Sequence, residues 1–168
     1  TPPTADLTHL SLLDSAKIAQ EDHPNNSLYT ANDVEALVNL FESKNYDQQF
    51  QINEFQICFR DAGHILGSAS VEIGVDGQKI IFSGDLGNSP SPILPDTEKV
   101  DNVDYLIMES VYGDRNHESR EDRRKFLEET IEDNYKRKGT LIIPTFSLER
   151  SQELLFELNA LVENNRIP

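Results

Sequence analysis

Apolar residues along the chain follow one of two periods, and the period changes near residue 47. Before that point they recur at helical spacing, at Leu7, Leu10, Leu12, Leu13, Ala16 and Ala19. This spacing predicts a helix that begins after an N-cap at Thr4 or Asp6. Thr30 followed by Asp33 predicts a capping box, and a second helix behind it. The apolar face of that helix would hold Val34, Leu37, Val38 and Phe41.

From residue 48 the apolar positions alternate with polar ones, which favours strands. We predict strands over about residues 48–60, 69–76 and 78–83, with a hairpin turn at residues 75–78. Two further apolar runs, at residues 105–108 and 141–144, predict short buried strands. The first of these runs would deliver Glu109 at its end.

The last third of the chain predicts two helices. Ser119 with Asp122 predicts the start of one, and Gly139 after three basic residues predicts its end. Its apolar face would hold Phe126, Leu127, Thr130, Ile131 and Tyr135. Ser147 is expected to cap the other helix, which follows the run at 141–144. This step from strand to helix predicts the start of a second α/β unit.

Composition places the chain among soluble globular proteins. It has 168 residues, 37% of them hydrophobic, and a single cysteine, Cys58. One cysteine excludes an internal disulfide framework and fits a reducing compartment, while its mid-strand position predicts a small core residue. No apolar run approaches the ~20 residues of a membrane span. We therefore predict a cytoplasmic protein that does not bind membranes.

Two glycine-rich turns carry the candidate chemistry. The segments 63–69 and 83–87 each follow an apolar strand and place one metal-competent side chain, His64 or Asp85, among small residues. Glycines let the backbone approach a metal closely and adopt angles that larger residues resist. Imidazole nitrogen and carboxylate oxygen are both ligands of catalytic zinc. On spacing alone, His64 is also compatible with a structural role.

Three segments in this order, 63–69, 83–87 and 109–115, resemble the metallo-β-lactamase-fold nucleases that carry a β-CASP domain. The likeness is greatest to the RNA-specific exonuclease branch, and the ribonuclease J and 3′-end-processing enzymes are related. The resemblance implies an α/β fold, with part of a metallo-β-lactamase αββα sandwich at residues 1–112 and the start of a β-CASP domain at 113–168. It also implies an internal part of such an enzyme, because the His-x-His-x-Asp-His motif and two later histidine motifs are absent.

The resemblance implies a zinc-dependent ribonuclease with two zinc ions in its complete site. His64 would bind the first zinc and Asp85 would bridge both. Glu109 would orient a histidine that protonates the leaving oxygen, although a strand-end glutamate could instead cap a neighbouring loop. We expect the chain alone to be inactive, because it offers two ligands where catalytic zinc sites use three.

Four further residues are weaker candidates for contact with RNA. Arg115 and His117 follow the Glu109 segment, and an interdomain hydrogen-bond role suits them equally. Ser147 and Arg150 belong to a segment in which relatives usually carry glycine before the arginine. This chain has Glu149 there instead, and a carboxylate at a helix N-terminus opposes a phosphate.

The net charge of −15 argues against strong RNA affinity, because counterion release from RNA needs basic residues. The sequence shows no basic patch with interleaved aromatic residues, and its acidic residues cluster at 14–54 and 118–133. Two alternatives stay open: a small-molecule hydrolase of the same fold, and a noncatalytic scaffold subunit of an RNA-processing complex. The oligomeric state is open too, and a homo-oligomer is one possibility.

Overall fold

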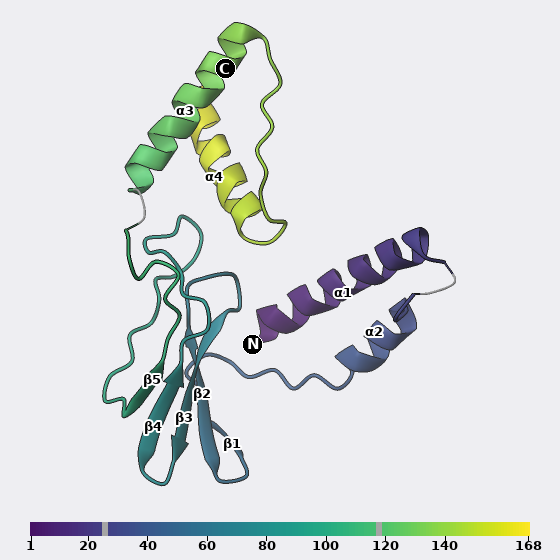
Figure 1. Cartoon of the computed structure of the whole chain (residues 1–168), viewed down its shortest axis with the longest axis vertical. Helices are drawn as coiled ribbons and strands as arrows, with labels where there is room; N and C mark the ends of the chain where they lie inside the picture. Colours follow the sequence, from purple (N-terminus) through teal and green to yellow (C-terminus); the bar gives the residue numbers. More distant parts are fainter. Residues whose placement is uncertain (25–26, 117–118) are drawn as a thin grey trace.

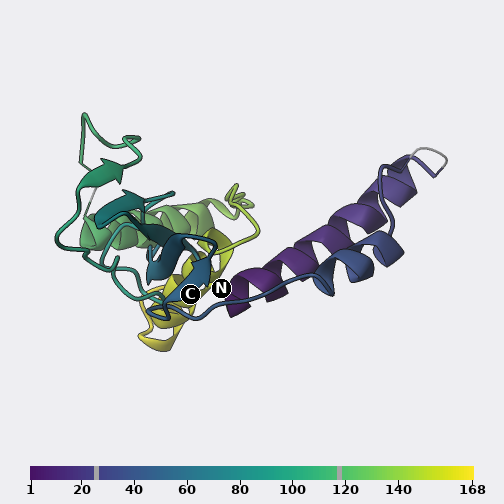
Figure 2. The same ribbon diagram turned by 90° about the horizontal axis from the view of Figure 1, so that it is seen from below.

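The structure, a computed structural model of the chain, describes residues 1–24, 27–116 and 119–168. A helical pair, a five-stranded sheet and a second helical pair follow one another along the chain (Figure 1). The first pair projects sideways from the sheet, and the second lies beyond the sheet end where the loops gather (Figures 1 and 2). The mixture of helices and a mixed sheet confirms the predicted α/β class.

The N-terminal pair consists of α1 (Pro2–Asp22) and α2 (Ala31–Val38). Ala16 and Val34 are the buried residues of the two helices, which lie side by side. α1 begins earlier than predicted, with Thr1 as its N-cap, because proline suits the first turn of a helix. The capping box of α2 is confirmed, since the Thr30 N–H donates to the Asp33 carboxylate at 2.8 Å.

The start of α1 is attached to a loop of the sheet. The hydroxyl groups of Thr1 and Thr4 both donate to the Gly67 carbonyl oxygen, at 2.7 and 2.8 Å. Gly67 has φ +87°, and a Cβ there would come 2.7 Å from the Thr4 nitrogen. Only glycine fits this contact, which fixes the N-terminus of the helix beside the His64 loop.

The sheet has the order β1-β2-β3-β4-β5, and neighbours among the first four strands are antiparallel. The strands are β1 (Phe50–Ile52), β2 (Phe55–Asp61), β3 (Ala69–Val75), β4 (Gln78–Phe82) and β5 (Tyr105–Ile107). The single strand predicted over 48–60 is wrong, because the chain turns at Asn53, which has φ 51°. Asparagine tolerates this left-handed conformation, so the alternation continues through a turn. The hairpin turn at 75–78 is confirmed, with positive φ at both central residues.

Among the described strands, β4 and β5 form the one parallel pair, and this pairing positions the candidate site. Phe82 of β4 lies opposite Ile107 of β5, so the segments after both strands leave from the same end of the sheet. The Ser83 N–H donates to the Ile107 carbonyl at 2.9 Å. The Glu109 N–H then donates to the Ser83 hydroxyl oxygen at 3.1 Å. The contact between the two segments therefore continues past the strands and brings Glu109 beside the Asp85 turn.

Few of the described residues are buried, and those that belong to the sheet lie in β2, β3 and β4. Cys58 and Ile81 are buried, so the predicted core role of Cys58 is confirmed. The predicted burial of residues 105–108 is wrong, because Leu106 and Met108 are each 58% exposed. β5 is an edge strand of the sheet, and β4 is its one neighbour among the strands that the structure describes.

A charged cluster supports the end of β2. The Arg60 guanidinium contacts the carboxylates of Asp47, Glu72 and Glu98, and Lys79 shares Glu72. Burial lowers the pKa of Arg60, but the hydrogen bonds that its guanidinium donates to Asp47 and Glu72 outweigh burial and leave the pKa raised. The Asp61 N–H also donates to Glu98. These contacts hold Glu98 beside Asp61, the residue at which β2 ends and the His64 loop begins.

The second helical pair is α3 (Arg120–Arg137) and α4 (Arg150–Glu163). The cap of α3 is confirmed, because Ser119 Oγ accepts from the Asp122 N–H at 3.1 Å. The predicted apolar face of α3 is wrong at Phe126 and Tyr135, which are 71% and 66% exposed, whereas its other three residues are half-buried. Ion pairs join α3 to the C-terminal segment instead, including Arg120 with Glu157 at 2.6 Å. No helix among the described residues is long and apolar enough to cross a membrane.

The connection between α3 and α4 differs from the sequence prediction. Residues 141–144 do not form a strand, and Ile142 is 83% exposed. A strand needs a neighbouring strand to satisfy its backbone groups, and no described residue pairs with this segment. The predicted Ser147 cap is also wrong, because the N-cap of α4 is Glu149.

Candidate active site

The His64 loop is built from hydrogen bonds between its own residues. The Asp61 carboxylate accepts from the Gly63 N–H at 2.8 Å. Ser68 Oγ accepts from the N–H groups of His64 and Ile65, at 3.1 and 3.2 Å. These bonds close the segment into a compact loop that fixes the backbone of His64.

The His64 and Asp85 loops meet through their glycines. The Gly87 N–H donates to the Ala62 carbonyl at 2.9 Å, and a Cβ on Gly87 would overlap the Gly63 carbonyl group. Gly63 has φ +62°, and its own Cβ would come 2.9 Å from the Pro95 carbonyl oxygen. The glycines that the sequence places around the candidate ligands are therefore required at a contact between two backbones.

This contact brings the two predicted metal ligands together. His64 Nε2 lies 3.8 Å from Asp85 Oδ2, although 20 residues separate them in sequence. The side chains are 38% and 75% exposed, so both reach solvent. An imidazole nitrogen and an exposed carboxylate oxygen at this separation present two ligand atoms to one space.

Glu109 fixes the loop that carries Asp85. Its Oε1 accepts from the Leu86 N–H at 2.7 Å, one residue after Asp85. Its Oε2 has no hydrogen bond within the part of the chain that the structure describes. Glu109 thus caps a neighbouring loop through Oε1, as one of the two alternatives predicts. Its Oε2 remains available for a second role.

The donor set fits zinc, but it is incomplete. Nitrogen from histidine and oxygen from aspartate suit zinc, and catalytic zinc sites use three protein ligands. Within residues 1–24, 27–116 and 119–168, no group of three or more histidine, cysteine, aspartate or glutamate side chains is arranged to hold a metal. His64 and Asp85 are thus compatible with part of a metal site.

A cleft of about 810 Å³ opens beside the pair. One wall consists of the His64, Asp85 and Glu109 loops, and the other consists of the facing ends of α3 and α4. Four arginines line the helical wall: Arg120, Arg123, Arg124 and Arg150. Sequence reasoning missed three of them. Their spacing on α3, at i, i+3 and i+4, places them on one helix face and was the available signal.

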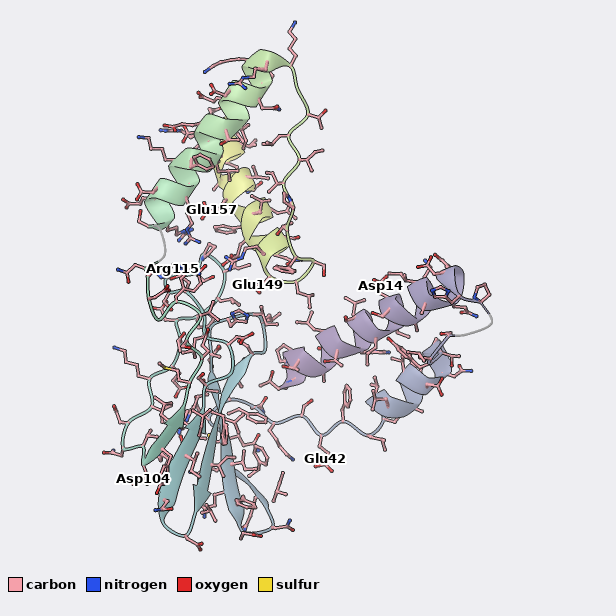
Figure 3. All side chains as sticks on the ribbon, in the orientation of Figure 1. Asp14, Glu42, Asp104, Arg115, Glu149 and Glu157 are labelled. Atoms are coloured by element: carbon pink, nitrogen blue, oxygen red, sulfur yellow. The ribbon has the colours of Figure 1, made fainter. Side chains whose placement is uncertain are left out.

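Glu149 connects the start of α4 to the His64 loop. Its Oε2 accepts from the Leu66 N–H at 3.2 Å, and its Oε1 is buried with no hydrogen-bond partner among the described residues. Burial raises the pKa of the Glu149 carboxyl. The carboxylate lies at the end of α4 nearest the sheet loops (Figure 3).

The backbone of Glu149 is strained. It has φ +61° and ψ −58°, and the Arg150 N–H donates to the Leu148 carbonyl at 2.8 Å. These values define a γ-turn with positive φ, the rarer and strained form. Glycine, the usual residue at this place in the resembled family, adopts such angles without a steric cost.

The remaining predicted contacts are distributed unevenly. Arg150 lines the cleft, whereas Arg115 and Ser147 do not. The Arg115 guanidinium stacks over the Tyr112 ring at 4.9 Å and lies 3.5 Å from Asp114. His117 lies outside the described residues.

His64, Asp85 and Glu109 follow β2, β4 and β5 of a mixed sheet, and all three line one cleft. The chain matches no protein-family profile. It is 34% identical to an RNase J-like protein of Methanocaldococcus jannaschii, over 99% of this chain and 39% of that protein. It is 34% identical to a ribonuclease of Thermus thermophilus, over 94% of this chain and 36% of that protein.

A third relative is cleavage and polyadenylation specificity factor subunit 3 of Dictyostelium discoideum. It is 32% identical over 95% of this chain and 21% of its own length. The chain thus spans well under half of these curated relatives. It is homologous, over nearly its whole length, to part of the β-CASP ribonucleases of the metallo-β-lactamase fold.

The strain at Glu149 predicts an unusual order of stability among variants. Glu149→Gly should be more stable than Glu149→Ala by roughly 1–3 kcal/mol, because only glycine relieves the positive φ. Thermal unfolding of both variants measures this difference. The same two substitutions at Thr30, an N-cap with φ −119°, control for capping. A difference at 149 no larger than that at 30 would contradict the strained turn.

Proposed function

We propose that this chain forms part of a zinc-dependent ribonuclease that hydrolyses RNA phosphodiester bonds beside His64 and Asp85. The observation that carries the proposal is the 3.8 Å approach of these two side chains at the edge of the cleft. Homology to proteins named as ribonucleases supplies the substrate class. The arginine-lined wall favours an anionic substrate over the small thioesters that related hydrolases use.

In this proposal, His64 and Asp85 would hold zinc through an imidazole nitrogen and a carboxylate oxygen. When bound, a metal pair acidifies a water and neutralises charge on the phosphoryl group. The remaining ligands would come from protein regions outside the part that the relatives share with this chain. The division at residue 112, with a metallo-β-lactamase-like region before it and a β-CASP region after it, belongs to the same proposal.

Glu109 is proposed to act through both carboxylate oxygens. Oε1 holds the Leu86 N–H and so positions Asp85. Oε2 is available to orient a protonated group that donates to the leaving oxygen. A carboxylate suits both tasks, because it accepts hydrogen bonds at each oxygen.

The proposed metal role predicts a large loss of hydrolysis in Asp85→Asn. The test grafts this chain into the M. jannaschii relative, in place of the 172 matched residues, and measures RNA cleavage with zinc restored after chelation. Because metal ions contribute several kcal/mol to such reactions, we expect less than roughly a hundredth of the unsubstituted rate. Asp76→Asn, in the exposed hairpin turn, is the matched control.

Retention of more than that fraction by the Asp85→Asn graft would remove Asp85 from the metal site. A folded, zinc-loaded graft that cleaves no RNA would contradict the proposed function itself. Melting and metal content of each graft are measured alongside, so that misfolding is recognised.

The two proposed roles of Glu109 separate in a pair of variants of the same graft. Glu109→Gln keeps an oxygen acceptor for the Leu86 N–H, so zinc content and melting should be unchanged. Its rate should still fall by some part of the ~10²–10⁴-fold that general acid assistance provides. Glu109→Ala should lower zinc content and melting as well. An unchanged rate in Glu109→Gln would leave only the positioning role.

A further inference from the structure

We propose that Arg120, Arg123, Arg124 and Arg150 form a binding track for the phosphate backbone of single-stranded RNA, on the helical wall of the cleft. The proposal rests on the proposed function and adds where the substrate is held. It is carried by the cleft lining, by the ion pairs that hold three of the arginines, and by the fourth arginine, which forms no ion pair with a described residue.

The charge of the cleft differs from that of the chain. The chain carries −15, whereas four arginines and four carboxylates line the cleft and balance each other. All four arginines come from α3 and α4, where they outnumber the two carboxylates of that wall, Glu153 and Glu157. Asp85 and Glu109 come from the opposite wall. An anion entering the cleft therefore meets its least repulsion along the helical wall.

Two carboxylates of α4 hold most of the track in place. Glu157 Oε1 accepts from Nε and Nη2 of Arg120, at 3.0 and 2.6 Å, and Glu157 Oε2 lies 3.6 Å from Arg124 Nε. Glu153 holds Arg150 at 2.6 Å. Both carboxylates are largely buried, with side chains 15% and 17% exposed. Glu157 lies between the two helices (Figure 3).

The arginines keep donors for a ligand after these pairs are made. A guanidinium has five N–H donors, and Arg120 uses two of its nitrogens on Glu157 while Arg150 uses one on Glu153. Planar guanidinium groups held by packing match phosphate oxygens better than mobile lysines do. Arg120 and Arg124 are one turn apart, about 6 Å along the helix axis, which allows contact with more than one phosphate.

Arg123 is the informative member of the track. It is exposed, lines the cleft and makes no ion pair with any described residue. A purely structural salt-bridge network between α3 and α4 gives no reason for its position. Its replacement also leaves no buried carboxylate without a partner, so it tests binding without a penalty to folding.

The test measures binding of a fluorescent oligouridylate to the 168-residue chain by anisotropy, in EDTA and over a range of salt concentrations. EDTA removes any metal, so a failure of hydrolysis leaves this result unaffected. We expect Arg123→Ala to weaken binding several-fold and Arg123→Glu to weaken it further. Loss of one phosphate contact should also reduce the slope of log affinity against log salt by about 0.7.

The matched control is Lys125→Ala, which removes the same charge from α3 at a residue that does not line the cleft. Its affinity and salt slope should stay near those of the unsubstituted chain. Equal losses in Lys125→Ala and Arg123→Ala would show a net-charge effect and overturn the track. Unchanged binding in Arg123→Ala, or no RNA binding by the chain at low salt, would overturn it too. Uridine monophosphate that competes as well as the oligomer would replace the track by a single-phosphate pocket.

Discussion

The contact between the backbones at Gly63 and Gly87 is the constraint on which the site depends. Any side chain on Gly87 would overlap the Gly63 carbonyl group, so the two loops meet at a distance that only glycine allows. The hydrogen bond from the Gly87 N–H to the Ala62 carbonyl fixes their relative position. His64 directly follows Gly63, and Asp85 lies two residues before Gly87. The contact between the glycines therefore brings the two side chains within 3.8 Å of each other. The parallel pairing of β4 with β5 then places Glu109 beside the Asp85 loop, where its carboxylate accepts a hydrogen bond from the Leu86 N–H.

The distribution of charge in the cleft reconciles an acidic chain with the proposed RNA substrate. Net charge describes the whole surface, whereas binding depends on the field within the cleft. The fold gathers four of the 15 basic residues on one wall of the cleft and pairs three of them with largely buried carboxylates. These carboxylates fix the guanidinium groups at some cost to net positive charge. The arrangement favours defined contacts over strong nonspecific attraction.

Local signals in the sequence were sufficient for much of the fold. The caps at Thr30 and Ser119, the hairpin turn at 75–78 and the strand ends before Asp85 and Glu109 were predictable, because each depends on neighbouring residues. The turn at Asn53 was missed, because the alternation of apolar residues continued through it.

Features that depend on distant contacts were not predictable. Residues 141–144 have the composition of a buried strand, but a strand needs a neighbour and the sequence does not say whether one adjoins it. The arginine track could not be predicted, because it depends on how α3 and α4 lie relative to each other. Arg120 and Glu157 form a hydrogen bond there although they are 37 positions apart in sequence. The strained turn at Glu149 and its bond to Leu66 likewise join segments that are far apart in sequence. The substitution of glutamate for glycine was visible in the sequence, but its backbone angles were not.

The central claim is that the two glycine-linked loops present His64 and Asp85 to the same metal ion. Imidazole ¹⁵N chemical shifts of the four histidines, followed during titration of the chain with Zn²⁺, test it most directly. Binding should be weak, because two ligands are fewer than a catalytic zinc site uses. The account predicts that the His64 shifts respond at lower zinc concentration than those of His9 and His23, and that Asp85→Asn removes this preference. A His64 response that is unchanged in Asp85→Asn, or that follows those of the other histidines, would contradict the account.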